Sequence, residues 1–374
     1  MARKPRVFTL VGTRPELIKL SLVIKALDRA TDHVLVHTGQ NFDFELNEVF
    51  FQELEIRKPN HFLNCARPSA VETIASVLVE SDKLFEREKP DAILIYGDTN
   101  SALAAITAKK RQIPVFHMEA GNRCFDQRVP EELNRKVVDH LSDINMTITE
   151  HARRYLLAEG LPADRVFKIG SCMPEILTQF ADKIAKMRTL ERLNLKPQEY
   201  FVVSVHREEN VDQEHRLNEI LAALKEIRQQ YDRPVIVSTH PRTRKRLEAF
   251  GIDLEKQGLT FMKPLGFFDY VQLQKNAKCV ISDSGTITEE AAVLHLPAIT
   301  LRDAYERPEG TDVGVLIKAP IQKDAIINAV EATIQRGDRV DEVADYLFRN
   351  VSETALAVIL SNIDVVNRVV WRKS

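Results

Sequence analysis

The sequence has few cysteines and no long apolar run. Its four cysteines lie far apart and form no Cys-x-x-Cys pair, so neither a disulfide framework nor a zinc ribbon is expected. Such cysteines suit a reducing compartment, and we expect a cytoplasmic protein. No stretch approaches the roughly 20 apolar residues of a membrane-spanning helix. The apolar run after the basic N-terminus is short and lacks a small-residue cleavage site, which is typical of a first buried strand and not of a signal peptide.

Neither sign of charge is in excess. With 52 Lys and Arg against 54 Asp and Glu, the net charge is −2 and the two signs are mixed along the chain. A nucleic-acid or membrane partner is therefore not expected, although a local group of arginines could still bind an anionic ligand. The sequence also lacks a Gly-x-Gly fingerprint and a Walker lysine loop, so nicotinamide and P-loop chemistry are not indicated, and we expect no cofactor.

The 374 residues, of which 44% are apolar, are enough for two α/β domains. Short apolar runs typical of strands buried on both faces alternate with stretches whose apolar residues recur at helical spacing. In the first half the predicted strands are 6–11, 33–38, 92–96 and 115–117, and the predicted helices are 17–27, 70–86 and 101–110. The pattern restarts with strands 200–205, 234–238 and 278–282 and with helices 217–229, 241–249 and 286–294. It predicts two parallel sheets covered by helices.

The domain boundary is expected near residues 170–175, which precede a polar helix rich in Lys and Arg. We therefore predict an N-terminal domain at 1–170 and a C-terminal domain at 171–353. A last apolar-periodic segment follows a polar stretch, and we predict that residues 354–374 form a helix that packs back on the N-terminal domain.

Several predicted strands end abruptly in polar residues. They run into Thr13-Arg14-Pro15-Glu16, Asp98-Thr99-Asn100, Met118-Glu119, His206-Arg207-Glu208 and Asp283-Ser284-Gly285-Thr286. Ligands of open parallel sheets bind just outside the carboxyl ends of the strands. These five strand ends, drawn from both halves, predict a shared crevice that carries the functional site.

Two of these turns are candidate anion sites. In the turn at residues 12–16, a glycine and a proline start a helix whose amides favour an anion, and Arg14 and Lys19 add positive charge. At residues 283–286, followed by Glu289 and Glu290, a Ser-Gly-Thr turn offers amides and hydroxyls to phosphate oxygens. Each turn could equally be a plain capped helix start.

Asp98, Glu119 and Glu131 form a set of carboxylates suited to removing a proton from carbon and returning it. A single carboxylate at such a place is more often a helix cap. The His117-Met118-Glu119 string is similar to the His-x-Glu of zinc deaminases, but the partner Pro-Cys-x-x-Cys is missing, so no metal is expected.

His206 could contact a diphosphate or protonate a leaving group, or simply cap its strand. Arg302 and Arg307 follow another strand, and they could add positive charge at the crevice or form surface ion pairs.

Six strings in register resemble the non-hydrolysing UDP-N-acetylglucosamine 2-epimerases. They are VGTRPELIKL, YGDTNSALAA, HMEAGNRCFDQRVPEELNR, SVHREEN, SDSGTITEEA and LRDAYERPEG, and together they cover essentially the whole chain. The resemblance implies two Rossmann-like domains in a GT-B arrangement with the active site in the interdomain cleft, and a homodimer. It also implies UDP bound mainly by the C-terminal domain.

Carried over by motif position, the resemblance implies Asp98, Glu119, Glu131 and His206 as catalytic residues. The residues implied for UDP are Arg14, Lys19, His206, Ser284, Gly285 and Glu290. The implied reaction removes the C2 proton of a UDP-N-acetylamino sugar while UDP leaves C1, and it passes through a 2-acetamidoglycal. Cationic groups would stabilise the departing diphosphate, and domain closure would keep water away from the glycal.

Three strings depart from the subgroup that acts on UDP-N-acetylglucosamine: Thr38-Gly39-Gln40-Asn41-Phe42-Asp43, Cys124-Phe125-Asp126-Gln127-Arg128-Val129, and DSGT in place of DSGG. The variants look like the branch that makes UDP-N-acetyl-L-fucosamine from UDP-2-acetamido-2,6-dideoxy-L-talose for capsule or O-antigen. Phe42, Phe44 and Phe125 would suit the methyl group of a 6-deoxy sugar, or they could be core residues. The departures also put an allosteric UDP-N-acetylglucosamine site in doubt.

Other functions remain open at this point. The first alternative substrate is UDP-N-acetylglucosamine. A GT-B glycosyltransferase shares the fold, but it would need an acceptor groove where this chain has three carboxylates. A nucleotide-sugar sensor would not need those carboxylates, and a hydrolysing epimerase would release free sugar.

Overall fold

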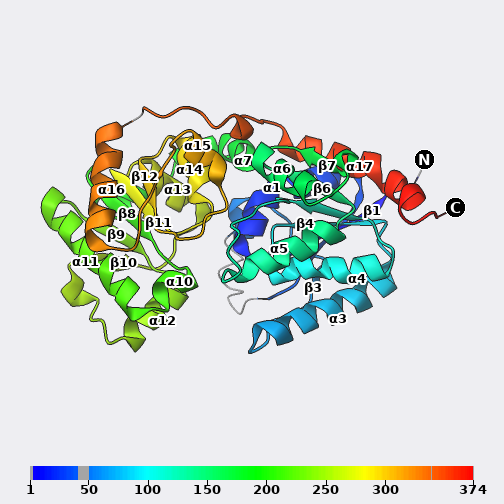
Figure 1. Ribbon diagram of the computed structural model, residues 1–374, viewed down its shortest axis with the longest axis horizontal. Coiled ribbons are helices and arrows are strands. Elements are labelled where there is room, and N and C mark those ends of the chain that lie inside the picture. Colours follow the sequence, from blue (N-terminus) through cyan, green and yellow to red (C-terminus); the bar gives the residue numbers. More distant parts are fainter. Residues whose placement is uncertain (1–2, 41–49, 338, 374) are drawn as a thin grey trace. The chain divides into compact units, whose positions relative to one another are not determined.

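The computed structural model describes residues 3–40, 50–337 and 339–373. The chain forms two compact units: unit 1 comprises Met1–Thr178 and Leu347–Ser374, and unit 2 comprises Gln179–Tyr346. Each unit contains one parallel sheet flanked by helices (Figure 1). The prediction of two parallel-sheet α/β domains is therefore confirmed.

The boundaries of these two units differ from those of the predicted domains, which were 1–170, 171–353 and 354–374. Two contacts explain the difference. Helix α7 (Met173–Gln179) is tied to unit 1 because Glu175 accepts a hydrogen bond from the Ser352 amide at 2.9 Å. Phe348 packs against Gly170, where an added Cβ would lie 2.5 Å from its ring. The return to unit 1 thus begins before the last helix does.

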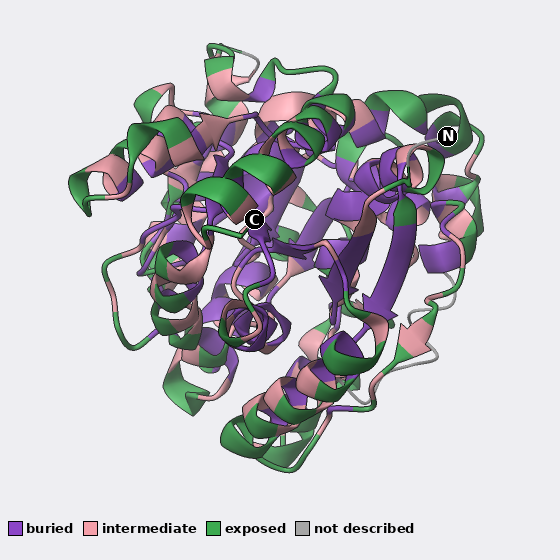
Figure 2. Ribbon diagram, turned by 90° about the vertical axis from the view of Figure 1, so that its right-hand side faces the viewer, coloured by how far each residue is buried: buried purple, intermediate pink, exposed green. Residues whose placement is uncertain are grey.

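Unit 1 has a seven-stranded sheet in the order β3-β2-β1-β4-β5-β6-β7, with every neighbouring pair parallel. Its strands are β1 (Arg6–Val11), β2 (Asp32–His37), β3 (His61–Phe62), β4 (Ala92–Tyr96), β5 (Val115–Met118), β6 (Ile144–Thr147) and β7 (Val166–Lys168). The central strands are buried along nearly their whole length (Figure 2), which is why they appear in the sequence as unbroken apolar runs.

The helices of unit 1 each bury one apolar face against this sheet or against a neighbouring helix. They are α1 (Arg14–Ala30), α3 (Ala70–Glu88), α4 (Ala104–Lys110), α5 (Pro130–Leu141), α6 (Glu150–Ala158) and α7, with α17 (Val351–Val369) from the end of the chain. Helix α17 packs along α1, and Arg29 donates to Glu353 at 2.6 Å. The predicted helix at 101–110 begins as a 3-10 turn (Asn100–Leu103) and continues as α4.

Unit 2 has a six-stranded parallel sheet in the order β10-β9-β8-β11-β12-β13. Its strands are β8 (Phe201–Ser204), β9 (Val235–Ser238), β10 (Thr260–Met262), β11 (Cys279–Ser282), β12 (Ala298–Thr300) and β13 (Ile317–Lys318). Its helices are α8 (Ala181–Ala185), α9 (Thr189–Arg192), α10 (Glu208–Val211), α11 (Glu214–Tyr231), α12 (Pro241–Ala249), α13 (Phe267–Lys275), α14 (Ile287–Leu294), α15 (Pro308–Asp312) and α16 (Lys323–Arg336). Across the described parts of both units, no helix is long and apolar enough to cross a bilayer.

Strand order reverses once in each sheet, between β1 and β4 in unit 1 and between β8 and β11 in unit 2. At such a switch point the loops from the carboxyl ends of the two strands turn to opposite faces and leave a place for a ligand. Four of the five polar turns singled out in the sequence follow these four strands, and the fifth, at Glu119, follows β5, the neighbour of β4.

Candidate active site

Glu119 lies directly after β5 and, among the described residues, accepts from Lys19 and Tyr96. Its Oε2 atom accepts hydrogen bonds from Lys19 Nζ at 2.7 Å and from Tyr96 OH at 2.6 Å. The side chains of Lys19 and Glu119 are only 5% and 14% exposed, so the ion pair is little weakened by water. The structure thus brings together two predicted site residues and adds Tyr96, which the sequence analysis missed because it reads as the last core residue of a strand.

Glu119 also has a left-handed backbone, with φ of +63°. Few residues other than glycine adopt this conformation, and its cost is accepted mainly where the surrounding structure enforces it. Strained residues of this kind are enriched at functional sites, which supports Glu119 as a functional group.

Asp98, after β4, is held by an arginine from α5. Arg135 Nε and Nη2 donate to Asp98 Oδ2 at 3.0 and 2.7 Å, and Arg135 Nη1 donates to Glu132 at 2.9 Å. Charge-assisted bonds of this kind are short and strong, and they fix the carboxylate in orientation. Arg135 was not singled out from the sequence.

Glu131 and Glu132 start α5 but differ in environment. Glu131 is partly exposed, whereas Glu132 is fully buried and accepts from the amides of Cys124 and Phe125, each at 3.1 Å. Glu132 therefore shapes the loop that precedes the helix, and Glu131 is the one of the pair that solvent or a ligand can reach.

The turn after β1 is capped by its own glutamate. Glu16 accepts from the amides of Gly12 and Thr13 at 2.6 and 2.7 Å, and from the Thr99 hydroxyl at 2.6 Å. Glu16 therefore occupies these two amides, as in a plain capped helix start. They do not remain available to an anion, which was the other prediction for this turn. Burial raises the pKa of Glu16 to about 7. Arg14, in the same turn, lies over the Phe50 ring at 5.5 Å.

In unit 2 the two strands at the switch point are joined by Asp283. This fully buried carboxylate accepts from the amides of His206 and Arg207 at 3.0 and 2.9 Å, and from Asn210 Nδ2 at 3.0 Å. The Nδ1 atom of His206 lies 3.2 Å from Asp283 Oδ1, and the ring is one-third exposed. Asp283 thus orients His206 while leaving its ring accessible.

The Ser284-Gly285-Thr286 turn carries a chain of polar contacts. Ser284 Oγ lies 3.0 Å from Thr286 Oγ1, which donates to Glu290 at 2.7 Å, and Gln274 Nε2 donates to the other Glu290 oxygen at 2.6 Å. The contacts fix the hydroxyls and the carboxylate of the turn relative to one another.

Cations surround the glycine of this turn. A Cβ added to Gly285 would lie 3.4 Å from Arg207 Nη2 and 3.7 Å from Arg302 Nη1, and 3.0 Å from Glu306 Oε1. Backbone amides next to guanidinium groups favour an anion such as phosphate, and only glycine leaves room for a close approach. These contacts therefore support the prediction that the Ser284-Gly285-Thr286 turn is an anion site.

The surface alternative for Arg302 and Arg307 is wrong. Both side chains are at most 3% exposed, and they pair with Glu306 at 2.7 Å and with Glu289 at 2.8 Å. The sequence did not show this, because a local pattern does not reveal that these arginines pair with Glu306, later in the same loop, and with Glu289 on α14.

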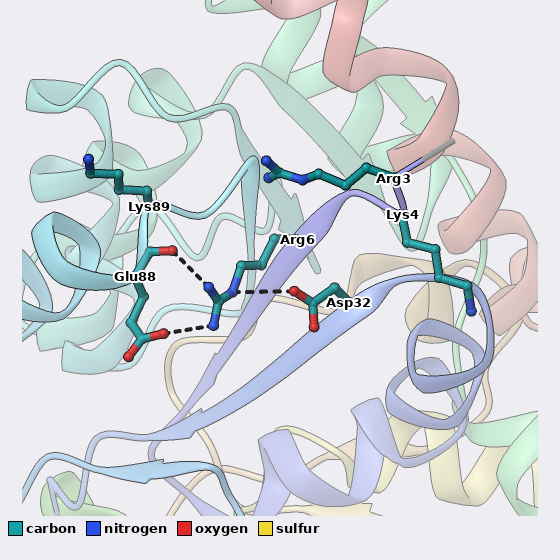
Figure 3. Close-up of a pocket in the computed structure, with 6 residues that line it drawn as sticks. All are labelled: Arg3, Lys4, Arg6, Asp32, Glu88 and Lys89. Carbon is teal, nitrogen blue, oxygen red and sulfur yellow. Dashed lines mark hydrogen bonds and ion pairs between the residues drawn. The ribbon is translucent and has the colours of Figure 1, made fainter. Parts of the chain in front are cut away.

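A pocket of about 390 Å³ lies elsewhere, at the amino ends of β1 and β2 (Figure 3). Arg6 in this pocket donates to Glu88 at 2.7 Å and lies 3.5 Å from Asp32. The pocket is at the opposite edge of the sheet from the polar turns, and its ion pairs are those of an ordinary solvated edge, so it is not part of the candidate site. Phe42 and Phe44, proposed from the sequence, lie outside the described residues.

Two Rossmann-like units with polar turns at the carboxyl ends of their strands define a protein of the GT-B fold class. A family model described as UDP-N-acetylglucosamine 2-epimerase matches residues 25–360. The chain belongs to this family and is an isomerase, which confirms the predicted epimerase class over the glycosyltransferase and sensor alternatives.

Related proteins support the assignment. The structure of UDP-N-acetylglucosamine 2-epimerase from Rickettsia bellii is 50% identical with a TM-score of 0.92, and the match covers 99% of this chain and 100% of that one. The Methanocaldococcus jannaschii enzyme in complex with UDP-GlcNAc and UDP is 34% identical with a TM-score of 0.89, over 95% and 99% of the two chains. The UDP-2,3-diacetamido-2,3-dideoxy-D-glucuronate 2-epimerase of Pseudomonas aeruginosa is 33% identical over 91% of this chain and 99% of that protein.

Proposed function

We propose that this enzyme inverts C2 of a UDP-N-acetylamino sugar without hydrolysing it, and that its substrate is UDP-2-acetamido-2,6-dideoxy-L-talose, which it converts to UDP-N-acetyl-L-fucosamine for capsule or O-antigen. The observation that carries the epimerase chemistry is the pair of carboxylates in unit 1, each fixed by its own cation: Glu119 by Lys19 and Asp98 by Arg135. Inversion through elimination needs a group that takes the C2 proton from one face and a group that returns a proton to the other.

The proposed reaction balances without a cofactor. One carboxylate takes the C2 proton, the C2–H electrons form the C1–C2 double bond, and the C1–O electrons leave with UDP. A carboxylic acid then protonates C2 on the opposite face, and UDP adds back to C1. We assign Asp98 and Glu119 to these proton transfers and Glu131, the accessible glutamate of α5, as the third carboxylate near the sugar.

The nucleotide is assigned to unit 2. The Ser284-Gly285-Thr286 turn and the neighbouring arginines would hold the diphosphate, and Glu290 would accept from ribose hydroxyls. His206, oriented by Asp283, would contact the diphosphate or protonate the departing UDP. Arg14 and Lys19 would add positive charge from unit 1.

The 6-deoxy sugar is favoured by an exposed aromatic residue. Phe125 is 67% exposed, has a left-handed φ of +57°, and packs edge-on against Tyr155 with ring centroids 5.2 Å apart. A bulky residue held in this conformation on the loop between Glu119 and Glu131 offers apolar surface that suits a methyl group better than a hydroxymethyl group. The Pseudomonas aeruginosa relative, named for a different UDP-sugar, indicates that substrates differ within the family.

The second candidate substrate is UDP-N-acetylglucosamine. Both solved structures described above are named for epimerases of this sugar, and the Methanocaldococcus jannaschii structure contains it. This alternative requires only that the loop around Phe125 accept a hydroxymethyl group.

We also propose that the enzyme is a homodimer. Helix α3 exposes Val71 and Val79, which are 76% and 51% accessible, and a second copy of the chain would cover them. Light scattering should give the mass of two chains, and the V71D/V79D double variant should give the mass of one. A single-chain mass for the unaltered protein would overturn the dimer.

Proton NMR in D₂O tests the reaction and its substrate together. Separate samples with each UDP-sugar and no added cofactor should show deuterium at C2 and a new epimer only with the 6-deoxy-L-talo sugar. Conversion of UDP-N-acetylglucosamine instead would establish the second candidate. Exchange in neither sample would contradict both substrates. The E119Q variant should lose turnover by orders of magnitude and still bind UDP, which separates the two proposed halves of the site.

A further inference from the structure

A buried polar network lies under the strand ends of unit 1, centred on Asp139 of α5. Asp139 is completely buried and accepts from the Gly121 amide at 3.1 Å and from Arg123 Nη1 at 2.6 Å. Its Oδ1 atom also lies 2.9 Å from His117 Nδ1. None of these groups reaches solvent, so the network does not itself contact a substrate.

The network touches the turns of both assigned carboxylates. His117 Nε2 donates to the Gly97 carbonyl at 2.8 Å, and Gly97 directly precedes Asp98. The Gly97 amide in turn donates to the carbonyl of Met118 at 2.9 Å, the residue before Glu119. On the other side of Glu119, the Gly121 amide is the one held by Asp139.

The turn at Glu119 needs an external restraint because its backbone is unfavourable. Glu119 has a left-handed φ of +63°, whereas Gly97 and Gly121, with φ values of +65° and +81°, adopt this region at little steric cost. A Cβ on Gly121 would lie 2.5 Å from the Ala152 carbonyl, so this turn is also pressed against α6. Without the hydrogen bonds from below, the chain around Glu119 would relax toward ordinary backbone conformations.

Arg123 anchors the network to the rest of the unit. It is 1% exposed, and its Nε and Nη2 atoms donate to Glu159 at 2.8 and 2.7 Å. His140 Nε2 also lies 2.9 Å from Glu159. Two carboxylates and an arginine therefore clamp the segment after Glu119 between α5 and the end of α6, which makes the position of Asp139 rigid.

We infer that Asp139 is a positioning residue that, through His117 and the Gly121 amide, sets Asp98 and Glu119 at the spacing the C2 proton transfers require. The inference rests on the proposed function, since it takes these two carboxylates as the reacting groups. It concerns orientation only, because Asp139 has no access to the sugar.

The test compares D139N with D143N. Asp143 is an equally buried aspartate of unit 1, where it accepts from Lys109 Nζ at 2.5 Å and from the Val115 amide at 2.9 Å, at the amino end of β5 and away from the turns. Both variants lose a buried carboxylate, but only the carboxylate lost in D139N is linked to the turns. We expect kcat to fall at least tenfold in D139N, with KM and UDP affinity within about twofold of the unaltered enzyme, and to stay near normal in D143N.

A double variant separates positioning from general destabilisation. If Asp139 acts through Glu119, D139N should reduce the residual C2 exchange of E119Q much less than it reduces that of the unaltered enzyme. His117→Phe should reproduce the D139N effect on kcat while retaining the Asp139–Arg123 ion pair, which keeps the test valid if D139N does not fold. Equal kcat losses in D139N and D143N, or a normal kcat in H117F, would overturn the inference.

Amide hydrogen exchange tests the same idea without turnover. In D139N, residues 97–99 and 119–123 should exchange faster than in D143N, whatever the substrate proves to be. Unchanged protection of both turns would refute the inference even if the epimerase proposal holds, and inactivity of the unaltered enzyme would count against the proposed function alone.

Discussion

Unit 1 should lose stability as pH rises because of Glu16, and replacing Glu16 with glutamine should remove this loss. Burial raises the pKa of Glu16 from 4.5 to about 7 in the folded protein, against the opposing effect of its hydrogen-bond donors. Between these two pH values the folded chain keeps a proton that the unfolded chain releases. The stability that this proton provides is fully present below about pH 4.5 and is lost as pH rises to about 7.

The size of the effect follows from the same two values. The difference corresponds to roughly 3 kcal/mol over the full range, and most of it falls between pH 5 and 8. For a unit of about 200 residues, 1 kcal/mol moves the melting temperature by about 2–4 °C. Between pH 5 and pH 8, the melting temperature of the unaltered protein should therefore fall by roughly 5–10 °C more than that of E16Q.

Glutamine can keep the geometry of this turn. Its carbonyl can accept from the Gly12 and Thr13 amides where Oε2 does now, and its amide can donate to the Thr99 hydroxyl. Calorimetry of both proteins across the pH range measures the trend. The E72Q variant is the matched control, because Glu72 caps α3 through Ser69 in the same way at an exposed position.

One result would refute the reasoning. If the melting temperature of E16Q relative to the unaltered protein is constant, or falls as pH rises, then the two amides and two hydroxyls around Glu16 stabilise its charged form more than burial destabilises it. The carboxylate would then be a permanent negative charge beside the turns of the site.

Three further predictions test single contacts. Tyr96→Phe removes one of the described donors to Glu119, the proposed catalytic carboxylate, and such a bond is worth about 1.5–3 kcal/mol for a charged acceptor. We therefore expect kcat to fall roughly 10- to 100-fold, whereas Tyr200→Phe, which loses a buried hydrogen bond in unit 2, should not change kcat. Gly285→Ala places a methyl group 3.0 Å from a Glu306 oxygen, and calorimetric titration should show UDP binding weakened about tenfold. Glu353→Ala breaks an exposed ion pair and should cost at most about 1 kcal/mol in urea unfolding.

The fold could be predicted largely because both sheets are parallel. Strands buried on both faces give uninterrupted apolar runs, and the run at 92–96 coincides with β4. The helices that cover such sheets keep a one-sided apolar pattern, so the alternation of the two could be followed along the chain. Short strands such as β3 and β13, with two residues each, give no such pattern and were not predicted.

Side chains of the candidate site were harder to predict because their partners are distant in sequence. Lys19 and Glu119 are 100 residues apart, and a local pattern gives no sign that they share a hydrogen bond. For the same reason, the sequence predicted Lys19 only as a ligand of the diphosphate and not as a partner of Glu119. Asp139 looks like one more polar residue on an amphipathic helix, and only its complete burial shows that it has structural partners.

Strand order is what converts these separate turns into a site. The sequence shows that Glu16 follows one strand and Thr99 another, but they can hydrogen-bond only because β1 and β4 are neighbours. His206 and Asp283 meet in the same way, because β8 is next to β11. In both sheets the bonded turns flank the point where strand order reverses, which is where a parallel sheet leaves room for a ligand. The polar strand ends could therefore be recognised from the sequence, but which of them act together depends on a strand order that the sequence pattern does not contain.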